Sequence, residues 1–163
     1  MAVDLFRTFA SQAFCGQSGF DYLFREVIHQ IEVAVHVNSP DTSFSFGRAQ
    51  KILNIIIKYC YVWLLCKQSD SPRFGDISWI NKWKPYFHVP VDRETIKHLK
   101  TKGELYQALP CFQNGNLISW KWKMTEHCYL VIQDAVRELA FAAGFDPICY
   151  EMKYIWVAGN NNS

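Results

Sequence analysis

The chain has 163 residues, a length that suits one domain with a single hydrophobic core. Half of the residues are apolar and 16% are aromatic, a composition that excludes an intrinsically disordered chain. The formal net charge of +2 is too small to indicate nucleic-acid binding by itself, although charge can still be concentrated in one place.

Helical patterns dominate the chain and strand alternation is nearly absent, so we expect an all-α protein, a compact helical bundle. In chain order the helices are predicted at residues 3–14, 21–35, 47–67, 77–84, after Asp92, at 125–143 and from Pro147 onward. Breaks between them are expected at residues 16–19, 38–43, 68–76 and 109–116. We expect one helical domain over residues 1–158 and a disordered tail at 159–163.

The cysteine pattern and the N-terminal residues predict a cytoplasmic protein without a metal site. The six cysteines lack C-x-x-C spacing and mostly stand within apolar segments, as reduced thiols do in cytosolic proteins. His127 and Cys128 are adjacent, but no partners follow at zinc-site spacing. Asp4 and Arg7 near the start are unlike a signal peptide. The apolar run 52–65 is too short to span a membrane, so we expect a buried central helix.

A lysine lies unusually close to the start of the most apolar predicted helix. In SFSFGRAQKILNIIIKYC, residues 43–60, Lys51 follows a turn at Gly47, although a cation near a helix N-terminus opposes the helix dipole. The later segment HVPVD ends in Asp92 at a predicted N-cap. A neutral lysine amine attacks carbon electrophiles, and a nearby carboxylate can shuttle its protons. Lys51 and Asp92 are therefore a candidate catalytic pair; the alternative is a solvent-facing lysine and an ordinary helix cap.

The segments GRAQK (47–51) and VPVD (89–92), each followed by a helix, resemble the helix-hairpin-helix DNA glycosylases, in particular the 8-oxoguanine DNA glycosylase branch. The resemblance implies that Lys51 is the Schiff-base nucleophile and Asp92 the catalytic carboxylate. Ala49 replaces the second glycine of the hairpin, and Lys51 and Asp92 are 41 positions apart (92 − 51). The chain has no iron–sulfur cysteine cluster like that of the endonuclease III branch.

The resemblance also implies residues that would contact DNA. Residues 47–49 would form a hairpin turn whose backbone amides face a phosphate. Aromatic side chains would stack on a flipped base, with tryptophans in the core as the alternative. The candidates are Gly47, Arg48, Gln50, Lys84 and His88 for nucleic-acid binding, and Trp83 and Gln133 for a base pocket.

The implied function is that of a DNA N-glycosylase, with or without AP lyase activity, acting on DNA without a metal or other cofactor. Lys51, helped by Asp92, would attack the anomeric carbon of a flipped nucleotide, or Asp92 would instead activate water.

Two other functions remain open from the sequence. The interleaved tryptophans and lysines of WINKWK and WKWK favour a non-catalytic helical module that binds nucleic acid or a protein partner. The segment REVIH resembles the Arg-x-His pairs of small helical ribonucleases, with Arg25 and His29 as the candidates, although its spacing is shorter and a polar helix face is the alternative.

Overall fold

The computed structural model describes residues 16–40, 44–66, 79–103, 112–113, 116–117 and 124–156. These residues are mainly helical, which confirms the predicted fold class, with one antiparallel pairing of Phe112 with Leu117 and Gln113 with Asn116. The elements are α2 (Gly16–Asn38), α3 (Phe46–Cys66), α4 (Trp79–Trp83), the 3₁₀ helix η1 (Lys84–Tyr86), α5 (Arg93–Lys100), β1 (Phe112–Gln113), β2 (Asn116–Leu117), α7 (Glu126–Ala142), α8 (Pro147–Tyr150) and the π-helix η2 (Glu151–Trp156). The helix expected at 3–14, the break at 68–76 and the tail lie outside the described residues.

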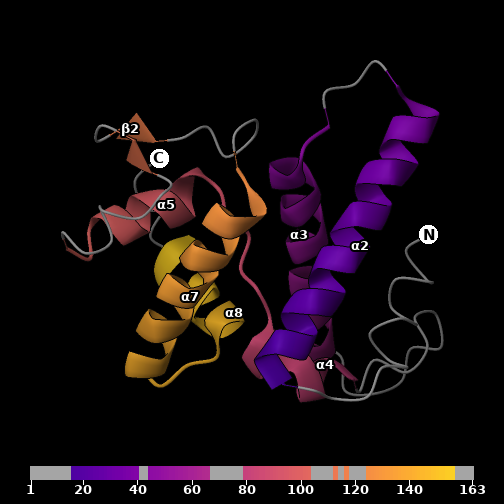
Figure 1. The fold of residues 1–163 in the computed structure, drawn as a ribbon. Helices are drawn as coiled ribbons and strands as arrows, with labels where there is room; N and C mark the ends of the chain where they lie inside the picture. Colours follow the sequence, from indigo (N-terminus) through magenta and orange to yellow (C-terminus); the bar gives the residue numbers. More distant parts are fainter. Residues whose placement is uncertain are drawn as a thin grey trace.

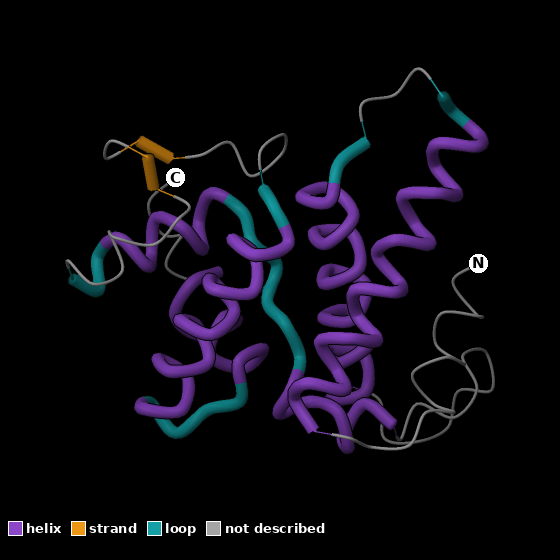
Figure 2. The backbone as a smooth tube through the Cα atoms, viewed as in Figure 1, coloured by secondary structure: helices purple, strands orange, loops and turns teal. Residues whose placement is uncertain are grey.

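The helices are arranged in two groups. The long helices α2 and α3 pack side by side, and α5, α7 and α8 lie together on the other side (Figure 1). An extended segment at residues 87–91 runs between the two groups (Figure 2). This segment is buried and leads directly into α5, so its course sets where α5 begins.

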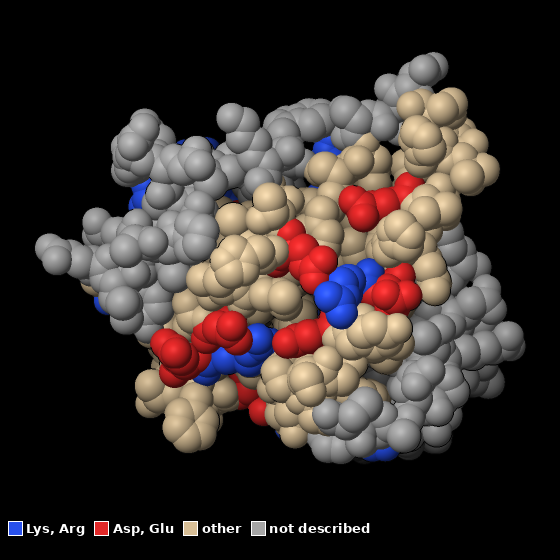
Figure 3. Space-filling model, viewed as in Figure 1, with Lys and Arg blue, Asp and Glu red and all other residues tan. Residues whose placement is uncertain are grey.

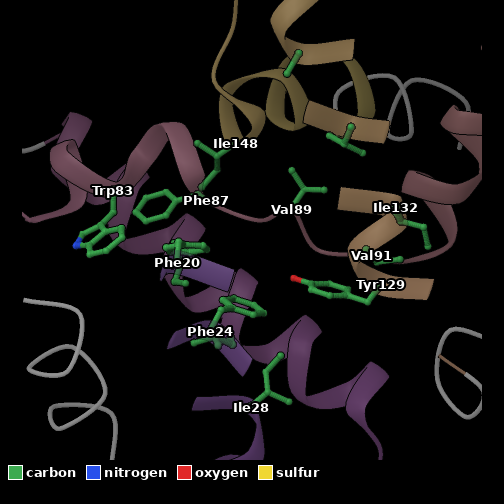
Figure 4. Packing of buried hydrophobic residues seen from close by; sticks show 14 of the residues in the cluster. Phe20, Phe24, Ile28, Trp83, Phe87, Val89, Val91, Tyr129, Ile132 and Ile148 are labelled. Carbon is green, nitrogen blue, oxygen red and sulfur yellow. The ribbon is translucent and has the colours of Figure 1, made fainter. Parts of the chain in front are cut away.

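Aromatic side chains from both groups and from the extended segment form the centre of the core. Phe20 of α2 has its ring centroid 5.8 Å from those of Phe24, Trp83 and Phe87. Tyr129 of α7 stacks on Phe24 at 5.8 Å (Figure 4). Aromatic pairs at these separations stabilise a core beyond their buried area. The core therefore joins the helices to the segment that crosses between them.

Local sequence signals explain most helix ends. The N-cap side chain of Asp92 accepts hydrogen bonds from the first turn of α5, as predicted, and Thr125 caps α7 through the amide of Cys128. At the end of α7, Gly144 has φ 73° and the amide of Phe145 donates to Ala140. This is a Schellman termination, which favours glycine because of the positive φ.

Two predicted boundaries and one predicted turn are wrong. The break expected at residues 16–19 lies inside α2, because only Gly16, the first residue of that helix, has a positive φ among them. The helical path also continues past its predicted end at Lys84, because Pro85 stands at the start of η1, where its missing N–H costs nothing. Residues 47–49, expected in a hairpin turn, belong to the first turn of α3. The amides of Arg48 and Ala49 donate to the carbonyl of Ser45, so neither amide faces outward for a phosphate.

Helix α3 carries apolar residues along its whole length, with polar and charged residues among them. Among the described helices it alone is long and apolar enough to cross a membrane by length and composition, and core helices of soluble proteins pass the same test. One side of α3 faces the core through Leu53, Ile57 and Tyr61, whereas Ile52 and Tyr59 on the other side are 44% and 65% exposed. The prediction of a central helix is thus confirmed for one face only.

Candidate functional site

Lys51 and Asp92 meet although they lie on different elements. The Nζ atom of Lys51, in the second turn of α3, is 3.1 Å from Oδ2 of Asp92, the N-cap of α5. Their side chains are 29% and 27% exposed, so the pair is open to solvent on one side. The other carboxylate oxygen of Asp92, Oδ1, accepts hydrogen bonds from the amides of Glu94 and Thr95. One oxygen therefore fixes the carboxylate while the other faces the amine.

The extended segment that carries Asp92 lies outside any sheet, so other groups must satisfy its buried backbone. Gln133 of α7 binds Val89 at both its N–H, 2.9 Å, and its C=O, 2.8 Å. Gln50 of α3 does the same at Val91, at 3.2 and 2.8 Å. Pro90 has no N–H, and its carbonyl accepts from the hydroxyl of Thr95. Every backbone polar group of residues 89–91 is thus paired, mostly by side-chain amides.

Asn54 connects this arrangement to the rest of the core. Its Nδ2 atom donates to the carbonyl of Val89, to Oε1 of Gln50 and to the hydroxyl of Tyr129. We call Gln50, Asn54 and Gln133, all of them buried, the amide clamp. Because a carboxamide offers both a donor and an acceptor, two glutamines reproduce the pairing that a neighbouring strand would give.

A buried histidine lies next to the clamp. His88 contacts the hydroxyl of Tyr129 through Nδ1 at 2.9 Å and Oδ1 of Asp21 through Nε2 at 2.7 Å. Burial lowers the pKa of His88, and the charge and hydrogen bond of Asp21 offset this only in part. The neutral imidazole therefore donates from Nε2 to the carboxylate, and its Nδ1 accepts the Tyr129 proton. Burial likewise raises the pKa of Tyr129, which keeps the hydroxyl protonated.

A second ion pair lies on the same side of α3, two turns further along. Nζ of Lys58 contacts both carboxylate oxygens of Glu151, the first residue of η2, at 3.0 and 3.1 Å. The ring of Trp156 covers Lys58 at 5.1 Å. Burial raises the pKa of Glu151, Lys58 opposes that rise, and the negative charge of Asp92 adds to it. The two ion pairs are therefore electrostatically coupled through their carboxylates.

Four of the predicted contact residues are turned inward, which corrects their assignment. Gln50 and Gln133 are buried and hold the extended segment. His88 is buried between Asp21 and Tyr129, and Trp83 packs on Phe20 in the core. None of these side chains reaches solvent in this conformation, so none is placed to contact a phosphate or stack on a base. Gly47 is also buried within α3.

Two predicted cationic contacts remain at the surface. Lys84 of η1 is 37% exposed and forms an ion pair with Asp146 at 3.3 Å. Arg48 is half-buried in the first turn of α3. Among the described residues Arg25 pairs with Glu126, and Arg137 pairs with Asp134. On the face shown in Figure 3, acidic and basic side chains of the described residues are interspersed. This face therefore carries no continuous basic patch in the part of the chain that is described.

The structure gives no support to the ribonuclease candidates or to a metal site in the described residues. Arg25 pairs with Glu126 from another helix, and His29 is exposed on α2. The four cysteines in the described ranges, at positions 60, 66, 128 and 149, are free thiols. The same ranges contain no cluster of three or more His, Cys, Asp or Glu side chains that could hold a metal ion.

The fold and the site together define a mainly helical domain with a partly open Lys–Asp pair beside a buried amide clamp. Comparison with known proteins finds no match for the chain among family models, curated proteins or solved structures.

Sequence reasoning missed the most constrained part of the site, the amide clamp and Glu151. A signal for the clamp was present, because Gln50, Asn54 and Gln133 are the polar residues that stand among apolar ones on the buried faces of α3 and α7. A buried amide in such a position must have hydrogen-bond partners. Glu151 carried no comparable signal, since its position depends on the π-helical path of η2.

Proposed function

We propose that the protein is a DNA N-glycosylase with AP lyase activity whose chemistry is centred on Lys51 and Asp92. The observation that carries the proposal is the 3.1 Å contact between the Lys51 amine and the Asp92 carboxylate, which joins residues far apart in the sequence. Both groups remain partly open to solvent, as a nucleophile and its proton acceptor must be to reach a substrate. The proposal includes a cytoplasmic location, supported by the free thiols of the described residues.

The ion pair suits the proton transfers of this reaction. Asp92 takes a proton from the Lys51 ammonium, and the neutral amine attacks the anomeric carbon of a flipped nucleotide. The C–N bond to the base breaks, the base leaves with the bonding electrons, and a bond from Nζ to the anomeric carbon forms. Asp92 then returns its proton to the leaving base, directly or through water. The C1′–O4′ bond then opens, a proton passes from Nζ to O4′, and a Schiff base remains. Removal of a proton from C2′ expels the 3′ phosphate and so cleaves the strand.

A borohydride-trapping experiment tests the proposal. Duplex DNA containing an abasic site, and separately a panel of oxidised and alkylated bases, is incubated with the protein and sodium borohydride. We expect a covalent protein–DNA adduct that disappears in Lys51→Ala. The matched control is Lys97→Ala, which removes an exposed lysine of α5 and leaves adduct formation unchanged. No adduct with any substrate, or an adduct that persists in Lys51→Ala, contradicts the lysine mechanism.

A second candidate function, a non-catalytic module that binds a protein partner or nucleic acid, is favoured by the outer face of α3. Ile52 and Tyr59 are exposed there, two turns apart. Ile56, which stands between them at helical spacing, is partly exposed as well, and a contiguous apolar helix face is typical of interaction sites. DNA affinity that survives both Lys51→Ala and Asp92→Ala, without base release, supports the nucleic-acid version. Absence of DNA binding at low salt supports the protein-binding version.

A further inference from the structure

A continuous chain of hydrogen bonds leads from the surface to Gln50, the residue before Lys51. It begins at Asp21 of α2, whose side chain is partly exposed, and passes through the buried His88 at 2.7 Å. From His88 it continues to the hydroxyl of Tyr129, 2.9 Å, and from there to Nδ2 of Asn54, 2.9 Å. The chain ends at Oε1 of Gln50, 3.1 Å from Asn54.

Gln50 holds the two halves of the pair in register. It directly precedes Lys51 on α3, and its side chain binds the N–H and C=O of Val91, which directly precedes Asp92. The contacts Gln50–Val91 and Lys51–Asp92 each join residues 41 positions apart, so they are consecutive links between the same two segments. A shift of the first link therefore displaces the second.

We propose that Gln50 is a positioning residue of the Lys51–Asp92 pair, and that the hydrogen-bond chain makes this positioning depend on the protonation state of His88. The inference rests on the proposed function in one respect: the position of the pair affects a reaction only if Lys51 and Asp92 are catalytic. The geometric link itself concerns the pair whether or not it is catalytic, so it is tested separately.

Protonation of His88 breaks the chain at a defined atom. In the neutral form Nδ1 accepts the Tyr129 proton, whereas in the cation Nδ1 carries a proton of its own. The Tyr129 oxygen already accepts from Asn54, so its own proton loses its acceptor and the contact must rearrange. The titratable and charged groups around His88 are Asp21 from α2 and Tyr129, Asp134 and Arg137 from α7. Burial lowers the pKa of His88, so the rearrangement occurs below its ordinary value of 6.5.

Nuclear magnetic resonance of the intact protein provides the test. The amide of Glu94 donates to Oδ1 of Asp92 and so reports the position of that carboxylate. On acidification of the wild-type protein we expect the Glu94 amide resonance to titrate with the same midpoint as the His88 ring. Absence of a Glu94 response at the His88 midpoint overturns the proposal, and so does acid unfolding before His88 is protonated.

A matched pair of variants separates positioning from stability. Gln50→Met and Gln133→Met each remove one buried amide that binds both polar groups of one residue of the extended segment, at Val91 and Val89 respectively. In Gln50→Met we expect His88 to titrate while Glu94 no longer follows it. In Gln133→Met the Glu94 response persists. Equal loss or equal retention of the response in both variants overturns the positioning role of Gln50.

Tyr129→Phe keeps the test decisive if Gln50→Met does not fold. This change removes a single hydroxyl from the middle of the chain and leaves Gln50 in place. We expect the Glu94 response at the His88 midpoint to disappear, and its retention contradicts the chain. The proposed function is judged independently by borohydride trapping. A titration that behaves as expected, together with no adduct, supports the positioning link and rejects the glycosylase chemistry.

Discussion

The two lysines of α3 illustrate how burial alone distinguishes similar ion pairs. Lys51 and Asp92 are each more than a quarter exposed, so their pairing contributes little to stability and leaves the amine accessible. Lys58 and Glu151 are 12% and 6% exposed, so each depends on the other to offset its loss of hydration. The first pair suits chemistry, and the second suits a structural role beside it.

Lys58→Met tests that structural role. Glu151 would remain buried without a counter-ion, and we expect a loss of about 3 kcal/mol of unfolding free energy at neutral pH. Burial already raises the pKa of Glu151, and removal of Lys58 takes away a group that lowers it. The folded variant then binds the Glu151 proton more tightly than the unfolded chain. The contribution of Glu151 to its stability is therefore fully present below the ordinary value of 4.5 and is lost as the pH rises through the folded pKa.

Urea denaturation at several pH values measures this effect. Lys84→Met is the matched control, because the Lys84–Asp146 pair is more exposed and its loss costs at most about 1 kcal/mol. A loss in Lys58→Met that does not vary with pH would show that Glu151 does not carry the effect.

Side chains of the site differ in how well the sequence predicted them. Asp92 could be predicted because an N-cap is a local signal, and Lys51 because its charge is unusual at that helix position. The inward orientation of Gln50, His88 and Gln133 depends on contacts with residues more than 40 positions away. Such contacts form only in the folded chain, so a pattern along one helix cannot separate a buried amide from a DNA-binding one.

At the scale of elements, α5 begins at a residue with two tasks. Asp92 caps the helix with one carboxylate oxygen and pairs with Lys51 through the other. Asparagine caps a helix about as well as aspartate, but it carries no negative charge. The two tasks can therefore be separated by substitution.

Asp92→Asn and Asp92→Ala form the corresponding experiment. We expect Asp92→Asn to abolish adduct formation with abasic DNA while its unfolding free energy stays within about 1 kcal/mol of the wild type. Asp92→Ala loses the cap as well and falls about 1 kcal/mol below Asp92→Asn. Thermal unfolding and borohydride trapping measure the two effects. Full activity in Asp92→Asn would leave the carboxylate without a catalytic role.

Element boundaries set by local sequence signals were predicted correctly, whereas those set by contacts with distant residues were not. The predicted helix at 47–67 matches α3 to within one residue at each end, and the Schellman glycine ends α7 where expected. The predicted break at 16–19 was wrong because tertiary packing of Phe20, Leu23 and Phe24 keeps this glycine-containing segment helical. The π-helical form of η2 has no recognised local signal and was not predicted.

At the scale of the whole molecule, the spacing of apolar residues predicted the all-α class. It did not predict that an extended segment runs through the centre of the fold. Its residues 87–91 are buried without a neighbouring strand, an arrangement that the amide clamp makes possible. The clamp draws on α3 and α7, which lie on opposite sides of the segment (Figure 2). The two helical groups are therefore joined by polar contacts as well as by the aromatic core.

This dependence on both groups has a consequence for how the molecule opens. The amide of Val89 would lose Gln133 if α7 departed alone, and the amide of Val91 would lose Gln50 if α3 departed alone. The aromatic core and the amide clamp join the two groups, so we expect the groups to separate only in global unfolding, and both amides to exchange with the denaturant dependence of the whole protein. Exchange measured at low denaturant concentrations checks this, because faster, denaturant-independent exchange at Val91 alone would reveal a local opening of α3, and at Val89 alone one of α7. The segment that carries Asp92 would otherwise keep its path for as long as the protein stays folded.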